Sequence, residues 1–217
     1  MINKRLLLIL ISVIIVIAAV LRIYQLGNVP PSPDWDEVAL GYDAYSIMQT
    51  GKDEFGKFLP VVLRSFDDYK PALYAYLIIP AISLFDLSVF AVRFPSAVFG
   101  VISVIAVFFL TREIFEKHKY RDYISLVSAF LMAISPWSLQ FSRVGFESNV
   151  AGSFNILTVL FFVKAIKKPW LFILSAVFAG LSIYIYQSEK VFTPLLVITL
   201  LLIFRKEIFA LSKKYIL

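Results

Sequence analysis

Three carboxylates follow the first apolar segment of the chain, within the stretch from Pro30 to Glu37. Asp34, Asp36 and Glu37 stand there beside a tryptophan, next to residues apolar enough to enter a bilayer. A carboxylate at a membrane edge can take a proton from a hydroxyl as a general base. The alternative is that Asp36 and Glu37 are only the acidic first turn of a helix, which the helix dipole favours.

Basic side chains at the ends of later apolar segments could supply the other half of a reaction centre. Lys70, Arg93 and Arg143 are of this kind. A cation can hold a phosphate and neutralise the charge that develops on it as a leaving group. Arg93 and Lys190 could equally be plain anchors at the ends of spans. A lipid-linked phosphosugar would require both a base and a cation at headgroup height.

Composition restricts the class of protein. The chain has 217 residues, of which 60% are hydrophobic and 17% charged, which is more apolar and less charged than soluble domains usually are. We therefore expect an integral membrane protein built of helices. The absence of cysteine excludes disulfides and thiolate metal sites. The net charge of +6 is better explained by basic loops between spans than by nucleic acid binding.

The apolar segments predict an all-α, polytopic transmembrane fold with about six spans. Arg22-Ile23-Tyr24 stands where a small-residue cleavage site would follow a signal peptide, so the first segment is interpreted as an uncleaved anchor. The stretches 71–85 and 191–204 are both short for a span. The uncharged stretches are 6–21, 71–85, 94–111, 123–142, 148–163, 169–188 and 191–204.

Loop charges favour a cytoplasmic N-terminus and six spans, with 71–85 lying in the interface or re-entering it. A seven-span arrangement with the N-terminus outside accounts for the basic residues as well or better, but it would place the acidic loop in the cytoplasm. In the preferred arrangement 22–93 is an outer loop with interfacial helices at about 36–50 and 71–85. Five further spans occupy 94–204, and 205–217 is a cytoplasmic tail.

This arrangement gathers charged residues from distant parts of the chain at one membrane surface. They include Asp34, Asp36, Glu37, Asp68, Lys70, Arg93, Arg143, Glu147 and Lys190. Placing ionisable groups at the edge of the hydrocarbon layer costs free energy, so these residues are candidates for function.

The order of several short motifs resembles the bacterial protein mannosyltransferase-like glycosyltransferases (glycosyltransferase family 39 and its relatives), over nearly the whole chain. Each motif is weak alone, and their order and spacing carry the resemblance. They are Pro30-Pro31 followed by Asp36-Glu37, then Gly41-Tyr42, Gly51, Leu59-Pro60, Asp68-Tyr69-Lys70-Pro71, Arg93-Phe94-Pro95-Ser96-Ala97 and Arg143-Val144-Gly145-Phe146-Glu147.

The resemblance implies roles for the matching residues. It places the catalytic base at Asp36-Glu37 and the donor phosphate at Lys70, with Arg93 and Arg143 as further cations. Asp34, Asp68, Tyr69, Glu147 and Lys190 are candidates for acceptor binding or for shaping the site. Many relatives have an acid one residue after Glu147. Relatives that use a metal have an acid where Tyr69 stands, so a divalent metal is possible here but is not predicted.

The resemblance further implies an enzyme of the bacterial plasma membrane whose active site faces outward. It would be an inverting transferase that moves a sugar from a polyprenyl-phosphate donor to a hydroxyl on protein, lipid or glycan. Such enzymes usually have more spans, so we expect 1–217 to be the N-terminal module of a larger enzyme. Alternatively, a second polypeptide supplies the missing helices.

Two alternatives remain: a non-catalytic membrane subunit or fragment that binds lipid phosphate, and a small transporter. A transporter would place charges near the middle of its spans, where this sequence has none.

Overall fold

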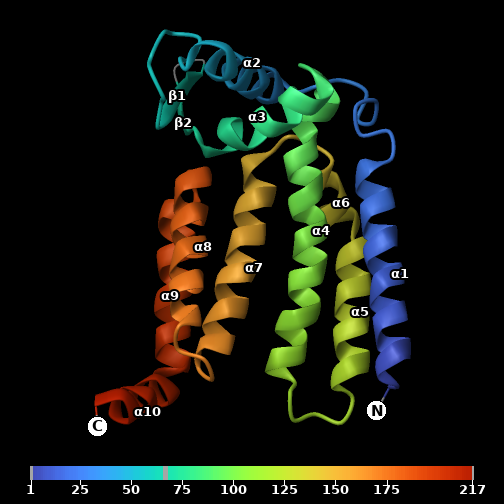
Figure 1. The fold of residues 1–217 in the computed structure, drawn as a ribbon, viewed down its shortest axis with the longest axis vertical. Coiled ribbons are helices and arrows are strands. Elements are labelled where there is room, and N and C mark those ends of the chain that lie inside the picture. The colour runs from blue at the N-terminus through green and yellow to red at the C-terminus, as the bar shows by residue number, and fades with distance from the viewer. Residues whose placement is uncertain (1, 66–67, 217) are drawn as a thin grey trace.

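The computed structural model describes residues 2–65 and 68–216, and Figure 1 shows two parts set across each other. Upright helices form a bundle, and a layer of two helices and a β-hairpin lies across one end of it. The bundle consists of α1 (Lys4–Ile23), α4 (Val89–Ile114), α5 (Arg121–Ile134), α6 (Pro136–Ser142), α7 (Glu147–Ala165), α8 (Leu171–Ile185) and α9 (Glu189–Ile203). The layer consists of α2 (Trp35–Thr50), β1 (Val62–Ser65), β2 (Asp68–Pro71) and α3 (Leu73–Phe85), while α10 (Arg205–Ile216) turns away at the opposite end.

The structure is mostly helical, as predicted. Within the described residues, α1, α4 and α7 are long and apolar enough to cross a bilayer, and the bent pair α5–α6 would make a fourth span. α8 and α9 have 15 residues each, about 22 Å of helix against a hydrocarbon core of about 30 Å. Length and composition alone thus identify three or four spans, and the predicted six stay a prediction.

The β-hairpin was not predicted. β1 and β2 pair antiparallel, with Leu63 opposite Lys70 and Ser65 opposite Asp68. Leu63 and Ser65 are buried while their neighbours along β1 are exposed, the alternation expected of a strand with one covered face. The hairpin takes up Lys70 and Pro71, so the helix expected at 71–85 begins instead at Leu73.

The predicted span at 123–142 is broken at Ser135, where α5 and α6 meet at an angle of 55°. Pro136 has no N–H to offer the carbonyl of Met132, four residues earlier. Arg22 of α1 supplies the missing donors. Its guanidinium donates to the carbonyls of Met132 (3.2 Å) and Ala133 (3.0 Å) and to Ser138 Oγ (2.8 Å).

Arg22 is fully buried, and α4 must come close to it. A Cβ atom at Gly100 of α4 would lie 2.7 Å from Arg22 Nε and 2.6 Å from Ser142 Cβ, nearer than real Cβ contacts. Gly100 therefore permits the contact of α4 with α1 and α6.

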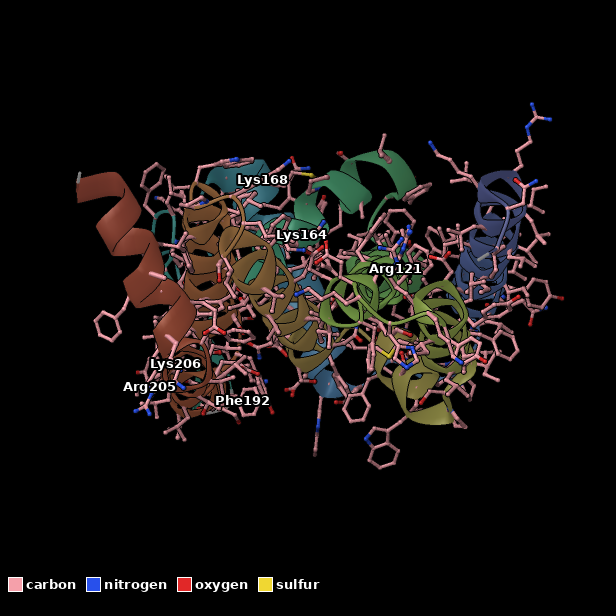
Figure 2. The ribbon with its side chains drawn as sticks, turned by 90° about the horizontal axis from the view of Figure 1, so that it is seen from below. Arg121, Lys164, Lys168, Phe192, Arg205 and Lys206 are labelled. Carbon is pink, nitrogen blue, oxygen red and sulfur yellow. The ribbon has the colours of Figure 1, made fainter. Side chains whose placement is uncertain are left out.

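Basic residues gather at the end of the bundle opposite the α2–α3 layer. Arg121 begins α5, Lys164 is in the last turn of α7 and Lys168 precedes α8, while Arg205 and Lys206 begin α10; Figure 2 labels all five in a view from below.

We predict that Gly100→Ala lowers the thermal unfolding temperature in detergent, because the added methyl group must displace Arg22 or α6. Overpacking of this kind typically costs about 1–3 kcal/mol. Gly180→Ala, in α8, is the matched control, since a Cβ there meets nothing within 4 Å among the described residues. Equal unfolding temperatures for the two variants would contradict this account of Gly100.

Candidate functional site

Glu37 and Arg93 form a buried ion pair that connects the outer layer to the bundle. Arg93 Nε donates to Glu37 Oε1 (2.8 Å) and Arg93 Nη2 donates to Oε2 (3.0 Å). Both side chains are almost wholly inaccessible, at 0% and 2% exposed. This two-pronged geometry is the strong form of an arginine–carboxylate pair.

Every N–H of the Arg93 guanidinium has a protein acceptor. Besides its two bonds to Glu37, it donates to the carbonyls of Leu26 (3.1 Å), Pro30 (2.8 Å) and Ser32 (3.0 Å). These five bonds use the full donor capacity of an arginine. The role expected of Arg93 was to hold the donor phosphate, but here its donors hold the segment between α1 and α2.

The Glu37 carboxylate accepts further hydrogen bonds besides those from Arg93. It also accepts from the backbone N–H of Asp34 (2.9 Å) and of Gly145 (2.7 Å). The bond from Asp34 is half of a capping box, in which the carboxylate reaches back to the start of its own helix. A Cβ at Gly145 would lie 3.1 Å from Val92, so a residue without a side chain brings this backbone to Glu37.

Asp36, the preceding residue, faces the other way. Its side chain is 36% exposed and pairs with Lys70 Nζ, which is 15% exposed. Both groups line a cavity of about 380 Å³ together with Trp35, Ser65 and Asp68. The structure thus brings the expected base and the expected phosphate-binding lysine into one cavity.

The hairpin positions Lys70. Residues opposite each other in an antiparallel pair share a face, and this face recurs every second residue. Ser65 and Asp68, and then Leu63 and Lys70, therefore point to the same side of the hairpin. Gln187, between α8 and α9, donates to the carbonyl of Tyr69, and Tyr184 donates to that of Val61 (3.1 Å), so the bundle supports the hairpin.

Glu147 begins α7 and is 7% exposed. The charges of Lys70, Asp36 and Asp68 all act on its carboxyl group. The structure therefore places Glu147 in the electrostatic surroundings of the Asp36–Lys70 pair, although the two parts of the chain are far apart in sequence.

Arg143 and Lys190 lie apart from the cavity lining. Arg143 donates to the carbonyls of Leu21 (2.6 Å), Tyr24 (3.0 Å) and Val29 (2.9 Å), where it holds the end of α1 and the residues that follow. Burial, and secondarily the charge of Arg93, lower the pKa of Arg143. Lys190 is exposed in the first turn of α9.

The remaining candidate residues are Asp34, Asp68 and Tyr69, which form local backbone hydrogen bonds or are exposed. Asp34 is the N-cap residue of α2, and its backbone N–H donates to Glu37 as described above. Tyr69 is 58% exposed. Asp68 accepts from the backbone N–H of Tyr69 (2.8 Å) at the rim of the cavity.

The residues that the structure describes do not form a metal site. Among them no three of His, Cys, Asp and Glu come close enough together to hold an ion. Tyr69, which stands where metal-using relatives have an acid, points its ring outward. We therefore derive no step through a metal.

Two residues of this region were missed by sequence reasoning. Ser65 lines the cavity, and its buried hydroxyl has no hydrogen-bond partner among the described residues. Asp43 of α2 is buried and accepts from the backbone N–H of Glu54 (3.1 Å), which holds the turn after α2. Burial raises the pKa of Asp43 to about 6, partly offset by that bond. Only the three-dimensional contacts distinguish these residues from other polar ones.

We predict that Glu37→Gln and Arg93→Met each destabilise the protein strongly, since each leaves a buried charge without its partner. Such losses typically amount to about 3–5 kcal/mol. The double variant should lose clearly less than the sum of the two, as measured by unfolding in detergent. Asp36→Asn, whose carboxylate is partly exposed, is the control and should stay within about 1 kcal/mol of the parent. Additive losses would show that the pair is not a unit.

The chain was compared with known proteins. The family model described as dolichyl-phosphate-mannose-protein mannosyltransferase matches residues 69–217, which is more than half of the chain. No curated protein and no solved structure was found to match it. The matched part begins at Tyr69 and includes Lys70, Arg93, Arg143 and Glu147, while Asp36 and Glu37 precede it. With its apolar helices and this match, the chain belongs to the dolichyl-phosphate-mannose-protein mannosyltransferase family, a family of membrane glycosyltransferases.

Proposed function

We propose that this chain takes part in transferring a sugar from a polyprenyl-phosphate donor to a hydroxyl acceptor, with Asp36 as general base and Lys70 as the phosphate-binding cation. The observation that carries this proposal is the pairing of Asp36 and Lys70 in one cavity of the end layer. The family membership supports a lipid-linked sugar donor.

The two groups match the two demands of the reaction. The acceptor oxygen attacks the anomeric carbon, its proton passes to the Asp36 carboxylate, and the bond from that carbon to the phosphate oxygen breaks. The lipid phosphate leaves with the bonding electrons, and the Lys70 ammonium stabilises its charge. A single displacement of this kind inverts the anomeric centre.

Lys70 can change partners during this cycle. An ammonium group has three N–H donors, so a phosphate oxygen can bind beside the carboxylate or replace it. In the proposed cycle the arriving phosphate draws Lys70 from Asp36, and the carboxylate is then available to the acceptor hydroxyl. Glu147, whose surroundings include both groups, shapes the field of the cavity.

The Glu37–Arg93 pair acts as a positioning device in this proposal. It fixes the first turn of α2 against α4, and Asp36 projects from that turn. Arg143 contributes in the same way by holding the residues after α1. The phosphate therefore depends chiefly on Lys70.

We further propose that the α2–α3 layer lies at the outer surface of a bacterial plasma membrane and that the chain crosses this membrane six times, with α8 and α9 as short spans. The basic residues at the opposite end support this orientation, because cytoplasmic loops are enriched in lysine and arginine. α3 lies within the end layer rather than upright in the bundle, which supports an interfacial position for it.

A catalytically incomplete module that binds lipid phosphate is the second candidate function. It shares the Lys70 site with the first but would show no turnover. Measuring donor binding and sugar transfer in parallel separates the two.

We predict opposite signatures for two variants. Asp36→Asn should lower sugar transfer by about 10²–10⁴-fold, the range of general base catalysis, while polyprenyl-phosphate binding persists. Lys70→Ala should weaken that binding about tenfold or more, because a charged hydrogen-bond partner is lost. Donor binding is measured on the purified protein in detergent. Sugar transfer is measured with this protein and any further polypeptide that the enzyme requires.

Two controls accompany these variants. Lys190→Ala removes an exposed lysine outside the cavity lining and should leave donor binding unchanged. Asp86→Asn alters the junction between α3 and α4, likewise outside the lining, and should leave turnover unchanged. Parental turnover in Asp36→Asn would reduce the carboxylate to a helix-start role, since asparagine caps helices about as well. Parental donor affinity in Lys70→Ala would remove the phosphate site.

The orientation has its own test. In this cysteine-free chain, Lys57→Cys should react with a membrane-impermeant thiol reagent on intact cells, whereas Lys117→Cys should react only after permeabilisation. Both positions are exposed; position 57 follows α2 in the end layer and position 117 lies between α4 and α5 at the opposite end. Labelling of intact cells at 117 but not at 57 would reverse the proposed orientation.

A further inference from the structure

A second cavity adjoins the one that holds Asp36 and Lys70. It has a volume of about 450 Å³, within the usual range for small-molecule sites. Trp35 and Ser65 line both cavities, so a ligand in the second reaches the wall of the first. The other residues that line it are Val38, Ala39, Tyr42, Glu54 and Phe55.

α2 supplies the apolar and aromatic wall of this second cavity. Trp35, Val38 and Tyr42 recur at helical spacing on its outward side and are 73%, 56% and 52% exposed. Phe55 closes the cavity from the turn after α2, and the Arg64 guanidinium lies 5.3 Å from the centre of its ring.

Polar groups stand at the margin of this wall. Glu54 offers a carboxylate, and the bond from its backbone N–H to the buried Asp43 holds it in place. The Ser65 hydroxyl is buried and has no hydrogen-bond partner among the described residues. A buried hydroxyl without a partner is costly, and rotation of this side chain towards the cavity would let a ligand hydroxyl relieve that cost.

We infer that the second cavity is the acceptor subsite and that it binds a sugar ring, so that the acceptor is a glycan; this inference rests on the proposed function of the first cavity. One face of a pyranose ring presents polarised C–H groups, which suit the negative faces of aromatic rings. Its hydroxyls suit a carboxylate acceptor and a serine hydroxyl. The shared wall then brings one acceptor hydroxyl towards Asp36.

The lining of the cavity favours a sugar over a polypeptide. An extended peptide binds along a groove or adds to a sheet edge through its backbone. Here side chains of α2, of the following turn and of Ser65 in β1 line a cavity next to the Asp36–Lys70 cavity. Aromatic faces among them suit the face of a sugar ring.

The test is a binding titration that follows the fluorescence of Trp35. Trp137→Phe and Trp170→Phe remove the other two tryptophans, both of which lie outside this cavity. Methyl α-D-mannopyranoside and a manno-disaccharide are the probes. We expect saturable changes, tighter binding of the disaccharide, and an affinity about threefold to tenfold lower in Tyr42→Ala and in Phe55→Ala. Circular dichroism and the unfolding temperature confirm that each variant is folded.

Tyr45→Ala is the matched control. Tyr45 lies one turn beyond Tyr42 on the same exposed side of α2 but does not line the cavity, so its variant should bind both probes as the parent does. Ser65→Ala should weaken sugar binding as well. All of these variants except Ser65→Ala, whose residue lines both cavities, should bind polyprenyl phosphate with parental affinity.

The outcomes separate this inference from the proposed function. Sugar binding that depends on Tyr42, together with a phosphate site that does not depend on Lys70, would support the subsite and refute the donor site. Intact donor binding with no saturable sugar response would overturn the subsite. A Tyr42-dependent response to a serine- and threonine-containing peptide, and not to sugars, would also overturn it and identify a polypeptide acceptor.

Discussion

The buried pair of Glu37 and Arg93 is the interaction on which the outer layer depends. Removing two charges from water is expensive, and the attraction between them offsets that cost only where geometry and further hydrogen bonds are good. Here the carboxylate accepts four hydrogen bonds and the guanidinium donates five. These bonds join α2, α4, the residues after α1 and the loop before α7. The pair therefore sets the position of four parts of the chain at once.

Two adjacent acids perform different tasks because they sit on a helix. Successive residues of a helix point about 100° apart, so burial of Glu37 against α4 turns Asp36 towards the hairpin. One carboxylate is thereby committed to structure and the other is left at the rim of a cavity, beside a lysine. Arginine forms the buried pair, where its planar fork matches a carboxylate, and lysine lines the cavity, where a compact charge could exchange partners in the proposed cycle.

Within the bundle, the buried guanidinium of Arg22 also binds backbone carbonyls of other parts of the chain. Pro136 interrupts the helix that begins at α5, and the carbonyls freed by that break lie where lipid would offer no donor. Arg22 reaches from α1 to bind them, and Gly100 lets α4 close over the contact. Both buried arginines thus satisfy backbone carbonyls that the irregular parts of the chain leave open.

Local patterns in the sequence were sufficient to predict the helical membrane class and the extent of α2. Apolar segments, the acidic first turn of a helix and the glycine at position 51 act over a few residues, so they can be read directly. The short β-hairpin and the different partners of Asp36 and Glu37 were decided by tertiary contacts. The same is true of Arg93, which the sequence could offer only as a cation at the end of a span. Its partners lie 56 to 67 residues away, and no local pattern encodes such contacts.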